Sequence, residues 1–138
     1  FDGTEGYAEQ QGMKQPMSED ELAEKAKEKG LFPETYLDAS TLTLVSLSAI
    51  DGVDVYKLKV EEDAYRYYDA ATGLLVRTEK SQEAQGQTIT SVQDLSDYRE
   101  VNGVLFPFVQ KITAGPQVIG MAASEIVVND GVSAEDFK

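Results

Sequence analysis

Histidine and cysteine are both absent from the chain. Without imidazole or thiolate groups it cannot build a His-Glu-x-x-His zinc site, a cysteine cluster, a Ser-His-Asp triad or a Cys-His pair. A serine or threonine activated by lysine is still permitted, but no pair in the sequence stands out for that role. We therefore expect no catalytic residue, no metal ligand and no cofactor, and we interpret the chain as a non-enzyme.

Basic residues are also scarce. Lysine and arginine total 12 against 25 aspartates and glutamates, for a net charge of −13. Nucleic-acid binding draws its affinity mainly from cations that displace phosphate counterions. Adsorption to anionic lipid likewise gains about 1 kcal/mol for each basic residue near the surface. Neither nucleic acid nor an anionic membrane surface is an expected partner.

Long hydrophobic runs are missing too, since no stretch approaches the ~20 apolar residues of a spanning helix. We expect no transmembrane segment. The first residue is Phe1, and nothing resembles a signal peptide, so we expect the chain to be a piece of a longer protein. Its 138 residues, of which 41% are hydrophobic, are enough for one domain over residues 1–138.

The N-terminal quarter predicts one helix. Glu5–Lys14 is polar and has the character of an extended, solvated strand. Ser18 and Glu21 then form a capping box, in which each side chain bonds the backbone N–H of the other residue. The helix is predicted over Glu19–Lys29 and is ended by Gly30.

From residue 40 onward the apolar residues recur with a period of two, which predicts an antiparallel β-meander. Two apolar phases within Thr41–Ile50 indicate a β-bulge. The predicted strands are Thr41–Ile50, Val53–Val60, Ala64–Tyr68, Leu74–Glu83, Gln87–Arg99, Val104–Thr113 and Gln117–Asn129. Turns are predicted at Asp51-Gly52, Glu61–Asp63, Asp69–Gly73, Gly86, Asn102-Gly103 and Gly115-Pro116.

Aromatic side chains are the first candidates for binding. Tyr65 and Tyr67 share one face of their predicted strand and Tyr68 faces the other way. They form either a ligand-stacking platform or cross-strand packing, and packing is the favoured interpretation. Alternate residues of Val104–Phe108 line a groove or fill the core, with the core favoured. Pro107 predicts an edge or a bulge there, because it cannot donate to a ladder.

Acidic side chains are the second candidates. Glu61–Asp63 and Asp69 could bind calcium or act as an acid/base pair. The spacing is not that of an EF-hand. A solvated turn is therefore the favoured interpretation.

Several strings, taken in order, resemble those of a known family, the LolA-like domains of outer-membrane lipoprotein-sorting proteins. The strings look like the version found at the C-terminus of Bacteroidetes M16-type zinc peptidases. The strings cover most of the chain: Phe1-Asp2-Gly3, Gly6-Tyr7, Lys14-Gln15-Pro16, Leu31-Phe32-Pro33, Tyr67-Tyr68-Asp69, Thr72–Leu75, Asp97–Val104 and Phe106-Pro107.

This resemblance implies a mainly β (α+β) fold: a curved antiparallel sheet of about seven or eight strands, an incomplete barrel, with one covering helix near the N-terminus. It also implies a periplasmic or cell-envelope location and an apolar hollow that shelters a lipid or a lipoprotein acyl chain. Each buried CH₂ group would contribute about 0.8 kcal/mol there. The alternative is an accessory domain that packs on a parent peptidase or on a second copy in a homodimer.

The predicted site follows from this resemblance and from strand alternation. The expected lid contacts are Leu22 and Leu31. The expected ligand-binding lining is Leu42, Leu44, Tyr65, Tyr67, Leu74, Val76, Phe106 and Phe108.

Overall fold

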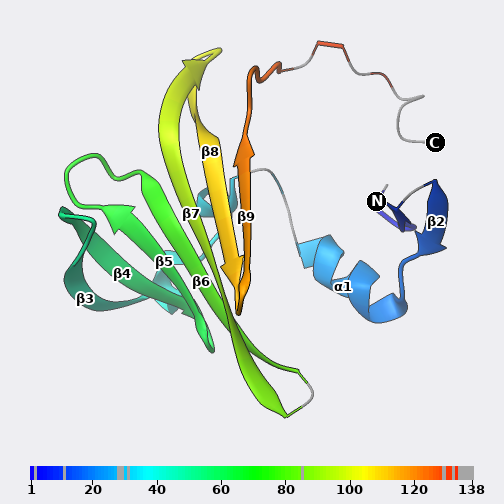
Figure 1. The fold of residues 1–138 in the computed structure, drawn as a ribbon, viewed down its shortest axis with the longest axis horizontal. Helices are drawn as coiled ribbons and strands as arrows, with labels where there is room; N and C mark the ends of the chain where they lie inside the picture. Colours follow the sequence, from blue (N-terminus) through cyan, green and yellow to red (C-terminus); the bar gives the residue numbers. More distant parts are fainter. Residues whose placement is uncertain are drawn as a thin grey trace. The chain divides into compact units, whose positions relative to one another are not determined.

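The computed structural model describes residues 1, 3–10, 12–27, 30, 32–84, 86–128, 130–131 and 133. The chain divides into two compact units. One comprises Phe1–Ala39 together with Asn129–Lys138, and the other comprises Ser40–Val128. The second unit contains the large sheet (Figure 1).

The first unit begins with a small hairpin. β1 (Tyr7–Gln10) pairs antiparallel with β2 (Met13–Pro16). Gly12, in the turn, has a φ of 78°, a conformation that glycine adopts without steric cost. The prediction of one extended run over Glu5–Lys14 is therefore wrong, because the chain folds back on itself at this turn.

The helix α1 (Glu19–Lys27) follows, and its predicted capping box is confirmed. The Ser18 backbone N–H donates to the Glu21 carboxylate at 2.7 Å, and the Glu21 N–H donates to the Ser18 hydroxyl at 3.3 Å. The bonds from Ser18 hold the pKa of Glu21 below its usual range. The last two predicted helical residues, 28 and 29, lie outside the described residues.

Two short 3₁₀ turns, η1 (Pro33–Thr35) and η2 (Ala39–Thr41), lead toward the sheet. Over the described parts of the chain, no helix has the length and apolar character needed to cross a membrane.

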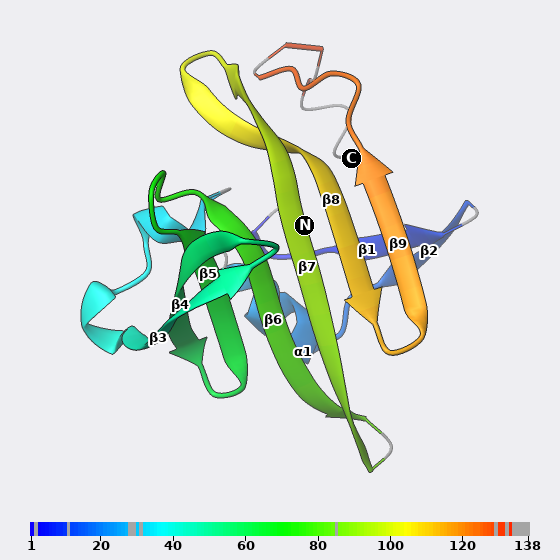
Figure 2. The ribbon, with the colours of Figure 1, turned by 60° about the vertical axis from the view of Figure 1, so that its left-hand side comes forward.

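The second unit is a seven-stranded antiparallel sheet in which neighbours in sequence are neighbours in space. Within the described residues its first and last strands each pair on one side only, so the sheet is open. Figures 1 and 2 show the long central strands bending along their length. The predicted mainly β fold, a curved sheet short of a closed barrel with one short helix, is confirmed. The strands are β3 (Thr43–Ile50), β4 (Val53–Glu61), β5 (Ala64–Asp69), β6 (Leu75–Ala84), β7 (Gln87–Val101), β8 (Val104–Ala114) and β9 (Gln117–Ala122).

Each predicted turn joins two strands, although Glu61 and Asp69 are themselves the last residues of β4 and β5. Asp51 and Asn102 have φ values of 50° and 53°, and the glycines that follow them are also at positive φ. Two-residue hairpin loops of type I′ need this conformation at both positions. The predicted bulge in β3 is confirmed at Val45, where the pairing with β4 shifts.

The last strand ends earlier than predicted. β9 stops at Ala122 instead of Asn129, although the Ala123 N–H still donates to the Phe108 carbonyl at 2.8 Å. The next residue along β8 is Pro107, which pairs with Tyr98 of β7 and has no N–H to donate. Pro107 therefore lies beyond the end of β9, where its strand has β7 alone beside it.

The β7–β8 hairpin extends past its neighbours. The pairing of β6 with β7 reaches Asp94, so the tip from Tyr98 to Pro107 is a two-stranded ribbon within the described sheet. Asp97 interrupts the pairing with a φ of 54°. The Tyr98 hydroxyl donates to the Leu75 carbonyl at 2.5 Å and links the ribbon to β6.

Candidate functional site

The register divides the sheet into two faces. One succession of directly opposed residues crosses five strands: Lys57, Tyr67, Arg77, Asp94 and Lys111. Directly opposed residues project to the same side of a sheet. We call this succession the charged ladder, and the surface that carries it the ladder face.

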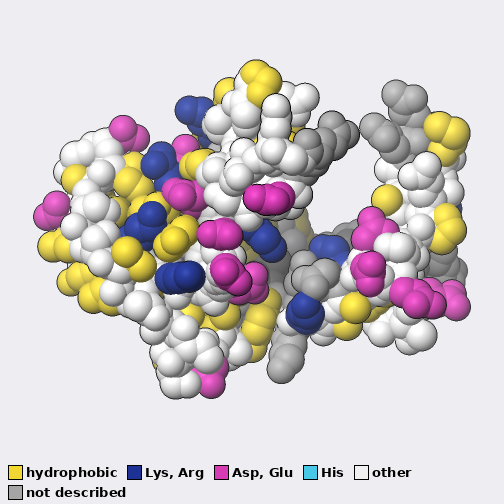
Figure 3. All heavy atoms as spheres, turned by 90° about the horizontal axis from the view of Figure 1, so that it is seen from below, with side chains coloured by type: hydrophobic (Ala, Val, Ile, Leu, Met, Phe, Trp, Pro, Cys, Tyr) yellow, Lys and Arg dark blue, Asp and Glu magenta, His cyan; other side chains and the backbone are white. Residues whose placement is uncertain are grey.

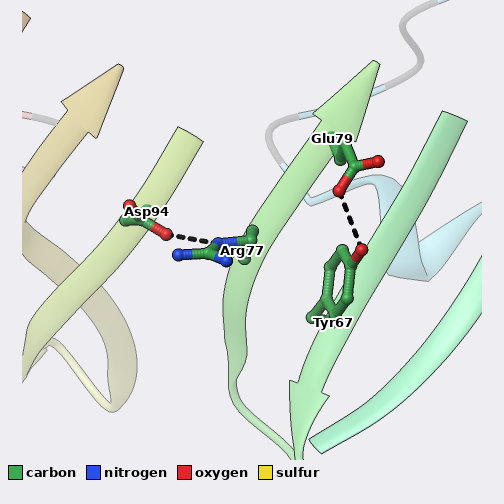
Figure 4. Close-up of polar contacts among 4 residues, drawn as sticks. All are labelled: Tyr67, Arg77, Glu79 and Asp94. Carbon is green, nitrogen blue, oxygen red and sulfur yellow. Dashed lines mark hydrogen bonds and ion pairs between the residues drawn. The ribbon is translucent and has the colours of Figure 1, made fainter. Parts of the chain in front are cut away.

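Side chains of the charged ladder contact one another and their neighbours. The Lys57 ammonium lies 4.0 Å from the ring centroid of Tyr65 and 5.2 Å from that of Tyr67. The Tyr67 hydroxyl donates to the Glu79 carboxylate at 2.8 Å (Figure 4). The Arg77 Nε donates to Asp94 at 2.6 Å. These contacts join β4 to β7 across the sheet.

The protonation of this network follows from its surroundings. A hydrogen bond with Tyr67 raises the pKa of Lys57, and burial raises the pKa of the Tyr67 hydroxyl. Lys57 is therefore charged and Tyr67 neutral at pH 7. A pair that is protonated at pH 7 acts by positioning side chains, which supports the cross-strand packing interpretation of the tyrosines.

The opposite face has its own succession. Its members are Leu44, Leu58, Arg66, Thr78, Gln93, Ile112 and Ile119, directly opposed from β3 to β9. Apolar residues occupy both ends and polar residues the middle strands. We call this surface the apolar face, and its end on β8 and β9 the β8–β9 patch, which consists of Val104, Phe106, Phe108, Ile112, Ile119 and Met121.

Hydrophobic side chains are unusually exposed on this sheet. In Figure 3 they gather on the side where β3 and β4 lie, and charged side chains intermingle near the centre. Leu47, on the apolar face, is 62% exposed. In contrast, the buried apolar residues among those described are Val55, Ala64, Tyr67 and Phe108. A sheet with so thin a core leaves apolar area available for a ligand or a partner.

The structure separates the predicted lining residues. Leu44, Phe106 and Phe108 lie on the apolar face, whereas Tyr65 and Tyr67 lie on the ladder face. One ligand on one side of the sheet cannot contact both groups. The prediction that these residues share one lining is wrong. Whether a residue of β5 and a residue of β8 project to the same side of the sheet depends on the register of every strand pairing between them.

The remaining predicted residues lie outside the regular ladders. Leu42 precedes β3 and Leu74 precedes β6. Val76 lies at the bulge of β6, between the positions that pair with Tyr67 and Tyr68. Leu22 is half-buried in α1, within the first unit, and Leu31 lies outside the described residues. The lid contacts remain a prediction.

Residues that the sequence did not single out complete the β8–β9 patch. Ile112 and Ile119 are directly opposed, as are Gln110 and Met121. The Arg99 guanidinium lies 4.5 Å over the Phe108 ring and also donates to the Asp97 carboxylate. The alternation of apolar residues in β8 and β9 could have identified Ile112, Ile119 and Met121 from the sequence. Nothing in the sequence pointed to the Arg99–Phe108 contact.

The acidic candidates lie apart. Glu62 and Asp63 precede β5 and Asp69 ends it, so they are separated by about 20 Å of strand. Glu61 lies 3.9 Å from Lys80. Among the described residues, no three carboxylates come close enough together to hold a metal ion.

Asp69 instead organises the turn between β5 and β6. Its carboxylate accepts the N–H groups of Ala71 and Thr72, both at 2.8 Å. These two bonds, that of Thr72 first, hold the pKa of Asp69 below its usual range. A carboxyl group with a depressed folded-state pKa contributes stability above its unfolded pKa of about 3.9 and loses it as pH falls.

We therefore expect Asp69→Asn to reduce stability at pH 7 and to flatten the acid limb of the stability curve, since the amide still accepts hydrogen bonds but does not titrate. Urea unfolding between pH 7 and pH 3 measures this. Glu62→Gln, which removes the same charge from an exposed turn, is the control. Identical acid limbs in wild type and Asp69→Asn would contradict the role of the Asp69 charge.

Comparison with models of protein families, with curated proteins and with solved structures yields no match.

Proposed function

We propose that this chain is a non-catalytic, LolA-like module of a bacterial cell envelope, located in the periplasm, that binds a lipid or lipoprotein acyl chain. The β8–β9 patch is the binding surface. The proposal rests on the order of the family-like strings and on the open antiparallel sheet. The apolar face of such a sheet is accessible to a ligand, because the strands do not close into a barrel.

The single observation that carries the proposal is the alternation of β8. Phe106 and Phe108 project to the apolar face, and the exposed Ile119 and Met121 lie on the same face in β9. An acyl chain lying along these side chains would bury CH₂ groups at about 0.8 kcal/mol each. Charged recognition is not needed, which is consistent with a net charge of −13.

Displacement of a fluorescent fatty acid tests the proposal. We expect micromolar binding by the wild type and a loss of about tenfold or more in Phe106→Asp, because a carboxylate would be desolvated beneath the ligand. Leu105→Asp is the matched control: it adds the same charge to the adjacent residue of β8, which projects to the ladder face. Circular dichroism verifies that both variants retain the sheet.

Equal loss in the two variants would contradict a binding surface on the apolar face. The second candidate function is an accessory domain, which the exposed apolar residues of β3 favour: Leu44 and Leu47 lie on the same face as Tyr56. Absence of fatty-acid binding by the wild type, with retained association to a parent peptidase, would support it.

A further inference from the structure

The two edge strands differ in charge from every strand between them. β4, β5, β6, β7 and β8 each contain at least one Asp, Glu, Lys or Arg. β3 and β9 contain none. Sheet proteins ordinarily protect their edges with charged residues, proline or bulges, because unpaired N–H and C=O groups attract another strand.

β9 lacks all of these protective features. Its sequence, Gln-Val-Ile-Gly-Met-Ala, has no charged residue and no proline, and its pairing with β8 has no register shift. All six residues are exposed, with Ile119 at 53% and Met121 at 46%. β3, in contrast, is interrupted by the bulge at Val45. The described sheet therefore has one regular, uncharged edge.

We propose that β9 pairs antiparallel with β9 of a second copy of this chain, which joins two sheets into one across a two-fold axis. The charge of the chain favours β9 as the strand through which two copies would associate. Two copies, each at −13, repel over most of their surface, whereas contact along β9 brings no carboxylate of the strand against another.

The register of the dimer follows from the faces. A two-fold axis perpendicular to the sheet makes each face continuous, so residues of the same face must oppose one another. Centring the axis on Gly120 places Ile119 opposite Met121 of the second copy and Val118 opposite Ala122 of the second copy. The two exposed apolar residues that β9 contributes to the patch, Ile119 and Met121, then gain a cross-strand partner.

The pairing uses the backbone edge and leaves the apolar face open. Although Ile119 and Met121 belong to both the patch and the pairing, dimerisation and ligand binding are measured separately, and failure of one does not imply failure of the other. A Cβ at Gly120 would meet no heavy atom within 4 Å, and its φ is not in the left-handed region. The position consequently accepts a side chain in the monomer.

The cysteine-free chain makes disulfide trapping a direct test. In Gly120→Cys the two thiols would face each other across the axis, and directly opposed Cα atoms lie about 4.5–5.5 Å apart, within the range a disulfide spans. We expect rapid oxidation to a covalent dimer. Ile119→Cys, whose counterpart is diagonal, should crosslink about tenfold more slowly, as should Leu47→Cys on the other edge.

Sedimentation of the wild type provides the second measurement, and we expect its mass to rise toward twice that of the monomer at tens of micromolar. Gly120→Glu should weaken this dimer about two- to fivefold, because like charges would be directly opposed. Gly120→Gln should leave it unchanged. A wild type that stays monomeric, preferential trapping through Leu47→Cys, or equal crosslinking at all three positions would overturn the proposal.

Discussion

Replacing Phe108 with alanine is expected to lower the free energy of unfolding by about 3–4 kcal/mol, since truncating a buried phenylalanine removes its transfer energy and leaves a cavity. Phe108 is 6% exposed, in a unit with few other buried apolar residues. The contact with the Arg99 guanidinium, 4.5 Å over its ring, is lost as well. Urea unfolding followed by circular dichroism measures the change.

Phe106→Ala is the comparison within the same strand. Phe106 shares the apolar face but is only half-buried, so we expect a loss of about 1–2 kcal/mol. Equal losses in the two variants would show that Phe108 is not the apolar centre of this part of the sheet. A loss confined to Phe106→Ala would contradict the assignment of Phe108 as the buried residue of the two.

Removing the Tyr67 ring is expected to have the second large effect. Tyr67 is 7% exposed, and Tyr67→Ala should cost about 3 kcal/mol or more through lost burial and the loss of the Lys57 and Glu79 contacts. Tyr67→Phe keeps the ring and removes one hydrogen bond, for which we expect about 1 kcal/mol. The difference between the two variants isolates the contribution of the ring.

The pKa of Lys57 distinguishes the hydrogen bond with Tyr67 from packing alone, because a loss of packing would not change this pKa. Its pKa is raised chiefly by the hydrogen bond with Tyr67, so Tyr67→Phe should shift the NMR titration of the Lys57 side chain toward lower pH. Tyr65→Phe is the control, because its ring also lies under the Lys57 ammonium. An unchanged Lys57 titration in Tyr67→Phe would contradict this coupling.

The turns and the fold class could be predicted because they depend on local chemistry. Asp51-Gly52 and Asn102-Gly103 require positive φ, and few residues other than Gly, Asn and Asp adopt it readily. The capping box of Ser18 and Glu21 was likewise readable from spacing alone. These features need no information from distant parts of the chain.

The sequence could not show which of the predicted lining residues share a face, because this depends on the register of several successive strand pairings. Tyr67 and Phe108 are separated by two complete strands, and a shift of one residue in any pairing exchanges the faces. The bulges at Val45 and Val76 are shifts of this kind. The early end of β9 could not be read from its own sequence, and in the structure it falls beside Pro107 of β8.

The two-stranded ribbon from Tyr98 to Pro107 gives this sheet an element that can move separately. An isolated pair of strands is marginally stable in water, so the ribbon depends on its attachment to the strands below it. The Tyr98 hydroxyl bond to Leu75 is one such attachment. Local opening of the ribbon would break this bond while the strands beneath remain paired, and amide groups at the tip would then reach solvent without global unfolding.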